Sequence, residues 1–202
     1  MSTLQALSDS SLNRRIVVGF SGGVTSAWCA AWALMNFPKE EVVLLFHDTK
    51  EEHTDTIRFL RDFAAKMNHP ITERSDGRSV EEVEDDEGML ANDRAAFCSR
   101  ILKVLPRLKY FDELRAQFVF DITLILGFTA DEWMRIQNHT MQAEQGGYSV
   151  RFPLSEAKTT KQQAADFIQC SLGIALPAMY EWSGHANCVG CRRGKKNYWW
   201  AV

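Results

Sequence analysis

A glycine turn between two apolar segments constrains the fold of this chain more than any other feature. An apolar run at residues 16–18 precedes Gly22 and Gly23, and a second apolar run with helix-like composition follows at residues 27–34. Paired glycines let the backbone adopt positive φ and approach a ligand closely. A strand, such a turn and a helix start, in this order, direct backbone N–H groups toward negative charge. The segment therefore predicts an anion-binding strand–loop–helix unit.

Hydroxyl side chains beside the two glycines make phosphate the expected anion. Ser21, Thr25 and Ser26 lie within this turn and offer further hydrogen-bond donors. A Gly-Gly pair alone would indicate only a tight connection between a strand and a helix, which remains the alternative. The turn lacks the lysine of a P-loop and the glycine spacing of the dinucleotide fingerprint.

Apolar strands alternate with helical patterns along most of the chain. Strands are expected at residues 16–20, 42–46, 71–73 and 122–128, and helices at 26–35, 53–68, 101–114, 131–142 and 161–172. Continuous apolar strands separated by helices indicate an α/β fold with a doubly wound, mostly parallel sheet covered on both faces. We expect a flexible arm at 1–14, a nucleotide-binding domain at 15–176 and a cysteine- and aromatic-rich appendage at 177–202. The acidic stretch 75–93 is interpreted as a solvated surface segment.

Composition excludes some functions. The 202 residues carry a formal net charge of −3, which argues against a broad basic nucleic-acid face but leaves a local patch open. No apolar run approaches the roughly 20 residues of a membrane span, so no membrane partner is expected. The five cysteines, an odd number, fit a reducing, cytoplasmic compartment. Cys29 and Cys170 lie in apolar helical patterns and are expected in the core.

Three predicted strand ends carry residues suited to a nucleotide. Ligands of open parallel sheets bind beyond the carboxyl ends of the strands. Besides the glycine turn, Asp48 and Thr49 follow the second strand and could hold a ribose or Mg²⁺. Gly127 and Phe128 follow a later strand, where glycine would let the backbone pass a flat base. If these strands are neighbours, the three ends form one crevice.

Three basic residues are candidates to oppose phosphate charge, and we assign them as candidate catalytic groups. They are Arg100, Lys103 and Arg135.

Cysteine spacing predicts a metal site near the end of the chain. Cys188 and Cys191 form a Cys-x-x-Cys knuckle in a glycine-rich loop, and Cys98 is the natural third thiolate. Three thiolates could hold a [4Fe–4S] cluster with one open iron, and His185 as a fourth ligand could close a zinc site. Free thiols without metal are the third alternative. A thioredoxin-like redox pair is the rival interpretation of the knuckle, but that motif belongs at a helix N-terminus rather than in such a loop.

Together these residues resemble the phosphoadenosine phosphosulfate reductase family of the PP-loop ATP pyrophosphatases. The turn at 21–26 is similar to the family's Ser-Gly-Gly-x-Asp-Ser loop, and residues 46–53 to its second strand end. Residues 98–106 resemble its Cys-x-x-x-(Lys/Arg)-x-x-Pro segment, residues 127–135 its late Gly-x-Arg-x-x-Glu loop, and residues 152–154 its Tyr/Phe-Pro-Leu motif. The likeness is strongest to short members from phages and mobile elements. It implies a Rossmann-like, HUP-type fold.

Two departures shape the functional hypotheses. Thr25 stands where many ATP-cleaving members carry aspartate, and no cysteine follows the aromatic end of this chain, so reduction through a tail thiolate is not expected. Phe97 before Cys98 leaves three thiolates, as in cluster-dependent thiolation enzymes of the group. The resemblance therefore implies an enzyme that binds ATP with Mg²⁺ and cleaves the α–β bond to adenylate a substrate, with sulfur transfer as a further step.

Other readings of the same residues stay open. The alternatives are a sulfonucleotide reductase or sulfotransferase-like enzyme, and a non-catalytic nucleotide-binding module. The acceptor could be tRNA, DNA or a small molecule, and a homodimer is an open alternative.

Overall fold

A five-stranded parallel sheet forms the centre of the molecule. The computed structural model describes residues 13–92, 95–186, 188–192, 194 and 196–200, so most of the arm expected at 1–14 lies outside the described residues. The strand order is β3-β2-β1-β4-β5. The strands are β1 (Arg14–Gly19), β2 (Val42–Asp48), β3 (Ile71–Ser75), β4 (Asp121–Ile125) and β5 (Ser149–Arg151). All four neighbouring pairs are parallel, which confirms the predicted fold class.

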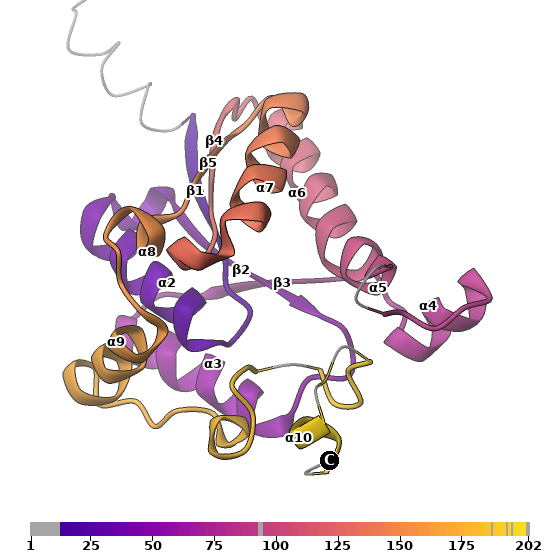
Figure 1. Cartoon of the computed structure of the whole chain (residues 1–202). Coiled ribbons are helices and arrows are strands. Elements are labelled where there is room, and N and C mark those ends of the chain that lie inside the picture. The colour runs from indigo at the N-terminus through magenta and orange to yellow at the C-terminus, as the bar shows by residue number, and fades with distance from the viewer. Residues whose placement is uncertain (1–12, 93–94, 187, 193, 195, 201–202) are drawn as a thin grey trace, which may run out of the picture.

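Helices cover both faces of this sheet (Figure 1). The first face packs against α2 (Val24–Asn36), α3 (Thr54–Met67), α8 (Pro153–Glu156), α9 (Lys161–Asp166) and the π-helical turn η4 (Phe167–Ser171). The second face packs against α6 (Leu105–Ala116) and α7 (Trp133–Gly146). Shorter elements are η1 (Lys39–Glu41), α4 (Val80–Glu87), α5 (Phe97–Ser99), η2 (Arg100–Val104), η3 (Ala130–Glu132), η5 (Ala178–Glu181) and α10 (Lys196–Trp199).

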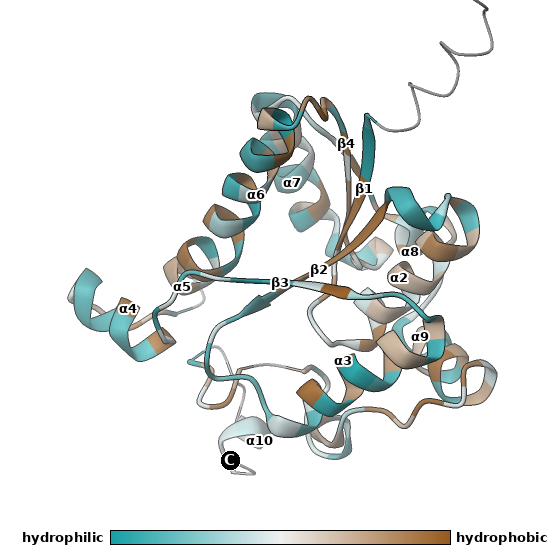
Figure 2. Cartoon of the chain, turned by 180° about the vertical axis from the view of Figure 1, so that it is seen from behind, coloured by the Kyte–Doolittle hydropathy of each residue, from teal (hydrophilic) through white to brown (hydrophobic). Residues whose placement is uncertain are grey.

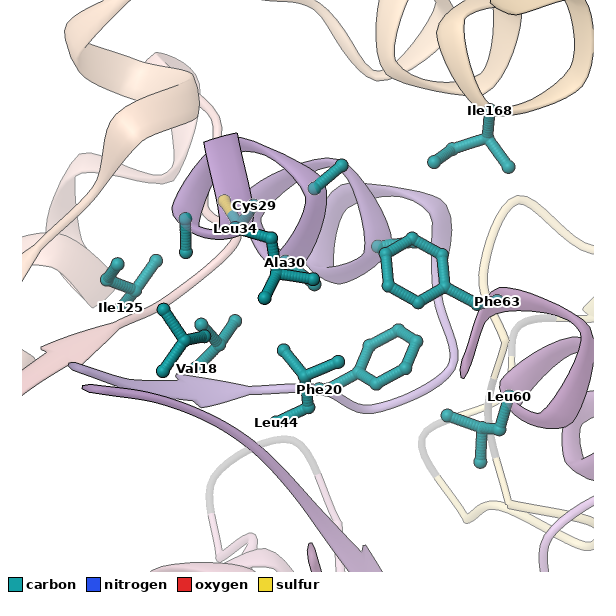
Figure 3. Packing of buried hydrophobic residues seen from close by; sticks show 14 of the residues in the cluster. Val18, Phe20, Cys29, Ala30, Leu34, Leu44, Leu60, Phe63, Ile125 and Ile168 are labelled. Atoms are coloured by element: carbon teal, nitrogen blue, oxygen red, sulfur yellow. The ribbon is translucent and has the colours of Figure 1, made fainter. Parts of the chain in front are cut away.

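Alternating strand residues supply the two core layers. Val18 and Phe20 point into the first layer, where Phe20 meets Phe63 of α3 at a centroid distance of 4.9 Å (Figure 3). Val17 and Leu45 point into the second layer. In Figure 2 most of β2 is brown, the colour of hydrophobic residues, whereas the edge strand β3 is largely teal. Strands buried on both faces carry the continuous apolar runs seen in the sequence.

A π-helical turn joins α5 to α6. Leu105 N–H donates to the carbonyl of Arg100, five positions earlier. Pro106 follows at the start of α6, where its missing N–H and bulky ring disfavour regular α-helical bonding to the preceding turn. The expected helix at 101–114 is therefore part of a longer, locally widened helix. This turn aims Lys103 toward the end of β2, because η2 packs on that strand.

Three expectations need correction. The stretch 75–93 is not simply solvated, because Val83 and Glu84 of α4 are buried and a Ser79 capping box starts that helix. Strand β5 was not expected, since three residues at a sheet edge give little periodic signal. Cys170 is exposed rather than in the core, because it lies two residues along η4 from the buried Ile168 and so on the opposite side of that turn. Cys29 is buried, as expected.

Among the described residues, no helix combines the length and the apolar character needed to cross a membrane.

Candidate nucleotide and thiol site

The turn after β1 is a compact glycine loop that leads directly into α2. Gly22 has φ of +77°, and a Cβ there would lie 2.5 Å from Thr56 Cγ2 of α3. The position therefore requires glycine both for its backbone conformation and for the close packing of α3. Ser26 donates to the carbonyl of Gly23 at 2.8 Å, and Ser21 lies 3.3 Å from the Ser26 hydroxyl. These bonds hold the loop in shape while Ser21 stays exposed.

A tyrosine from the C-terminal segment caps this loop, and no sequence pattern predicted this contact. No side chain of the loop caps α2; the Val24 N–H donates instead to Tyr180 Oη at 3.0 Å. Burial raises the pKa of Tyr180, so its hydroxyl stays neutral and accepts this bond. Lys161 Nζ lies 5.3 Å from the Tyr180 ring centroid, which brings a cation to the same place. The only signal in the sequence was an aromatic, irregular tail.

His185 lies in this neighbourhood as well. Its Nδ1 is 3.0 Å from Lys161 Nζ, and Ser183 accepts a hydrogen bond from its backbone N–H at 3.2 Å. The structure thus places His185 beside Lys161, and its role as a metal ligand stays a prediction.

The strand ends that were expected to share a crevice are neighbours, because β1 lies between β2 and β4. Gly127 packs against the first turn of α2: a Cβ there would lie 2.7 Å from Thr25 C and 2.8 Å from Ser26 N. The close approach that requires glycine is therefore made to the glycine loop itself. Phe128 follows, stacked on Phe152 at a centroid distance of 5.8 Å.

Two of the three candidate basic residues are exposed. Arg135 places its guanidinium carbon 4.1 Å from the Phe128 ring centroid and pairs with Glu132. Arg100 is exposed on η2. Lys103, by contrast, reaches the end of β2.

The end of β2 holds the cysteine knuckle. Asp48 Oδ1 accepts a hydrogen bond from Lys50 N–H at 2.8 Å, which shapes the loop after the strand. Thr49 is 1% exposed; its hydroxyl donates to Glu52 Oε1 at 3.0 Å and lies 3.3 Å from Cys188 Sγ. Thr49 therefore faces the knuckle. Glu52 and Cys188 form an antiparallel bridge, so two segments far apart in sequence lie side by side here.

A lysine and a carboxylate surround the Cys188 thiol. Lys103 Nζ lies 3.8 Å from Cys188 Sγ and 3.6 Å from Glu52 Oε1. Burial raises the pKa of Cys188, and Lys103 opposes this shift. Burial would lower the pKa of Lys103, but the charges of Cys188 and Glu52 outweigh it and raise that pKa.

The other two thiols belong to the same cluster. Cys191 and Cys98 also raise the pKa of Lys103. Burial raises the pKa of Cys98, and Cys191 raises it further. Tyr198 clamps the knuckle, since its hydroxyl donates to the Cys188 carbonyl and accepts from the Cys191 N–H at 3.1 Å. Three thiols are a suitable donor set for a soft metal centre. As placed, however, no three His, Cys, Asp or Glu side chains of the described residues surround one ion position.

An open pocket of about 500 Å³ adjoins the knuckle. It lies between the loop after β2, the start of α4 and residues 189–192. Arg192 closes one side by donating to Glu84 at 3.1 Å. The thiol cluster is therefore adjacent to a space that a small ligand could reach.

Comparisons with known proteins agree with this architecture. The model of the phosphoadenosine phosphosulfate reductase domain matches residues 15–123, which include β1 to the first part of β4, the glycine loop and Lys103. Among solved structures, the chain is similar to phosphoadenylyl-sulfate (PAPS) reductase from Candida auris in a phosphate complex. The TM-score is 0.57 at 17% identity, over 93% of this chain and 88% of that chain, a likeness that shows the fold. No curated protein matches the chain.

Proposed function

Since the chain belongs to the phosphoadenosine phosphosulfate reductase family of the PP-loop superfamily, we propose that it is an enzyme that binds an adenosine sulfonucleotide. Loop 21–26 binds the phosphate groups, and the sulfur-bearing end reaches the thiol cluster of Cys98, Cys188 and Cys191. The observation that carries this proposal is the position of the loop. It follows the central strand β1, with the thiol cluster at the end of the adjacent strand β2.

The loop supplies donors rather than metal ligands. Ser21 is exposed, and the helix start at Val24 adds backbone N–H groups at the positive end of the α2 dipole. Mg²⁺ bound with nucleotide phosphates usually takes one or two protein carboxylates. Thr25 provides none, and Asp48 is engaged with the Lys50 N–H. This pattern favours a sulfonucleotide over Mg-ATP.

Lys103 and the thiols would act on the sulfur-bearing group. The ammonium of Lys103 is suited to offset negative charge on a sulfate or on a departing sulfite. Two thiols that oxidise to one disulfide release two electrons and two protons, the number needed to convert the sulfonyl group to sulfite with release of the nucleotide. Cys188 and Cys191, joined by a 3.2 Å backbone hydrogen bond, are the pair we assign to this step.

A metal centre is the alternative role of the same thiols, because thiolates that hold a metal are not free to form the disulfide. Cys98, Cys188 and Cys191 would hold a [4Fe–4S] cluster or zinc, and such a centre would polarise or position a bound group next to Lys103. The soft donor set fits either centre.

Cleavage of ATP between the α and β phosphates is the second candidate. The gathering of three thiols around one lysine favours it, because thiolation enzymes of the superfamily combine adenylation with such a centre. Arg100, Lys103 or Arg135 would then oppose the charge that develops on pyrophosphate.

Calorimetry with the full chain separates the two candidates. We expect phosphoadenosine phosphosulfate to bind at least tenfold more tightly than ATP, with or without Mg²⁺, and Ser21→Ala to weaken it. Ser149→Ala, an exposed serine on the edge strand β5, is the matched control. Sulfite and adenosine 3′,5′-bisphosphate are the expected products with a thiol reductant. Tighter Mg-ATP binding with release of AMP and pyrophosphate would support the second candidate instead, and binding without turnover of either ligand would indicate a non-catalytic module.

A further inference from the structure

We propose that Arg107, His47 and His139 form a binding site for a tetrahedral oxyanion of the sulfate or phosphate class. The site lies between the sheet and helices α6 and α7. It involves none of the loop or thiol residues, and it does not depend on the proposed function.

Three separate elements bring these side chains to one layer. On β2, Val43 and Leu45 pack into the second core layer, and His47 continues that face by the two-residue strand period. Arg107 comes from α6 and His139 from α7, the two helices that lie together over this face (Figure 1). The His139 ring is 5.3 Å from the Phe128 ring. Burial lowers the pKa of both imidazoles and the charge of Arg107 lowers it further, so Arg107 is near each of them.

Burial and missing partners distinguish this cluster from ordinary core polar residues. Arg107 is 6% exposed and His47 is 9% exposed, whereas His139 is half-buried. Arg107 Nε and Nη2, His47 Nε2 and His139 Nδ1 have no hydrogen-bond partner among the described residues. Buried polar atoms are almost always hydrogen-bonded, so four unpaired nitrogens in one layer indicate that a bound group is missing.

The unpaired edge of Arg107 identifies the chemistry of that group. Nε and Nη2 lie on the same side of a guanidinium, and this side binds two oxygens of one oxyanion in a bidentate manner. A neutral ligand or a water molecule could accept these hydrogen bonds but would leave the buried charge unbalanced.

The charged groups that act on the two imidazoles are all cations. The groups that act on His47 are Arg107, Lys103 and Arg74, and those that act on His139 are Arg107 and Arg135. Tyr148 is the further polar neighbour of Arg107 and carries no negative charge at neutral pH. Lys103 pairs with Glu52, Arg74 with Glu113 and Arg135 with Glu132. Arg107, by contrast, forms no ion pair with a carboxylate of the described residues, so its buried charge is the one that a bound anion would offset.

Sodium sulfate is the probe, titrated at constant ionic strength against sodium chloride. In the full-length protein, we expect sulfate to raise the melting temperature and to shift the imidazole NMR signals of His47 and His139, while His53 and His69 stay unchanged. Arg107→Met keeps most of the side-chain volume and removes the charge. We expect it to fold, to be at least as stable in chloride, and to bind sulfate at least tenfold more weakly. Arg61→Met, an exposed arginine on α3, is the matched control.

Two further experiments identify the source of the anion and distinguish this site from loop 21–26. In Ser21→Ala the sulfate response of His47 should persist, so a failure of the proposed nucleotide function would not remove it. If the site takes a group of the nucleotide, adenosine 3′,5′-bisphosphate will displace sulfate. Arg107→Met will then reduce the affinity for adenosine 3′,5′-bisphosphate more than the affinity for AMP. If the site takes a free ion, sulfate and adenosine 3′,5′-bisphosphate will bind at the same time. Unchanged His47 and His139 signals with sulfate, or an equal response in Arg107→Met, would overturn the proposal and assign the unpaired nitrogens to buried water.

Discussion

Replacing Gly127 with alanine tests whether the loop is held by direct contact with the end of β4. The new Cβ would lie 2.7 Å from Thr25 C and 2.8 Å from both Thr25 O and Ser26 N. All three are backbone atoms, so no side chain can rotate away. Ordinary contacts are about 3.5–4 Å, so the loop and β4 must separate by roughly 1 Å.

The expected cost follows from this clash. Overpacking of a core typically costs about 1–3 kcal/mol. The reduced flexibility of the unfolded chain with alanine offsets about 0.4–1 kcal/mol of it. We therefore expect a net loss of about 1–2 kcal/mol, which lowers the melting temperature by roughly 2–8 °C for a chain of this size. Because the displaced backbone is the loop itself, nucleotide affinity should fall by about tenfold, or about 1.4 kcal/mol.

Urea unfolding and calorimetric titration of the nucleotide measure the two effects. Gly184→Ala is the control, because nothing lies within 4 Å of a Cβ at that position. It should stay within about 0.5 kcal/mol of the parent protein. A Gly127→Ala protein with parent-like stability and affinity would show that this contact does not set the loop position.

Three other predictions concern charge, metal and pH. Glu84 is buried and accepts hydrogen bonds from Ala91 N–H and Arg192. Glu84→Gln should therefore lower the free energy of unfolding by about 1–2 kcal/mol and speed tryptic cleavage after Arg192, whereas Glu81→Gln on the same helix should do neither. Equal cleavage rates in the two variants would contradict this. Protein purified anaerobically should contain iron or zinc. The metal should be lost in Cys98→Ser, Cys188→Ser and Cys191→Ser but kept in the variant of the exposed Cys170, Cys170→Ser. Loss of the metal in His185→Ala would identify a four-ligand zinc site, and metal-free parent protein would mean that the thiols act unligated. Burial, together with Arg107, lowers the pKa of His47 from 6.5 to about 3, so the unfolded chain binds more protons than the folded chain between these values and stability falls as pH drops below 6.5. In chloride buffer, the free energy of unfolding measured with urea should fall by about 1 kcal/mol between pH 7 and 5.5 because of His47. His47→Gln should remove this contribution, and an unchanged pH dependence in the variant would show that His47 is not the group responsible.

The fold was largely readable from the sequence because the signals were local. Continuous apolar runs marked β1 and β2, and the amphipathic pattern of α3 agreed with its buried Phe59 and Phe63. The loop after β1 was found for the same reason, since glycines and hydroxyls stand together in the chain. The condition that three strand ends meet was satisfied by the strand order.

Contacts between distant residues could not be read in this way. Tyr180 caps α2 from 156 positions away, and no pattern near either residue indicates the bond. The cluster of His47, Arg107 and His139 gave no signal either, because each residue is isolated in its own element. The contact of Thr49 with Cys188 was also not predicted, since a hydroxyl after a strand does not reveal which later segment packs on it. The predicted role of Thr49 at a ribose or Mg²⁺ stays a prediction.

The bridge between Glu52 and Cys188 has a consequence for how the molecule assembles. These residues are 136 positions apart, so the chain must close a very long loop before the contact can form. The sheet contacts that position Glu52 involve β1, β2 and β3, all of which are made long before residue 188 leaves the ribosome. We therefore expect the knuckle to dock last during folding, onto a sheet that is already formed. The three thiols would then come together only in the fully folded chain. A nascent or truncated chain could form loop 21–26 before Cys188 and Cys191 are in place beside it.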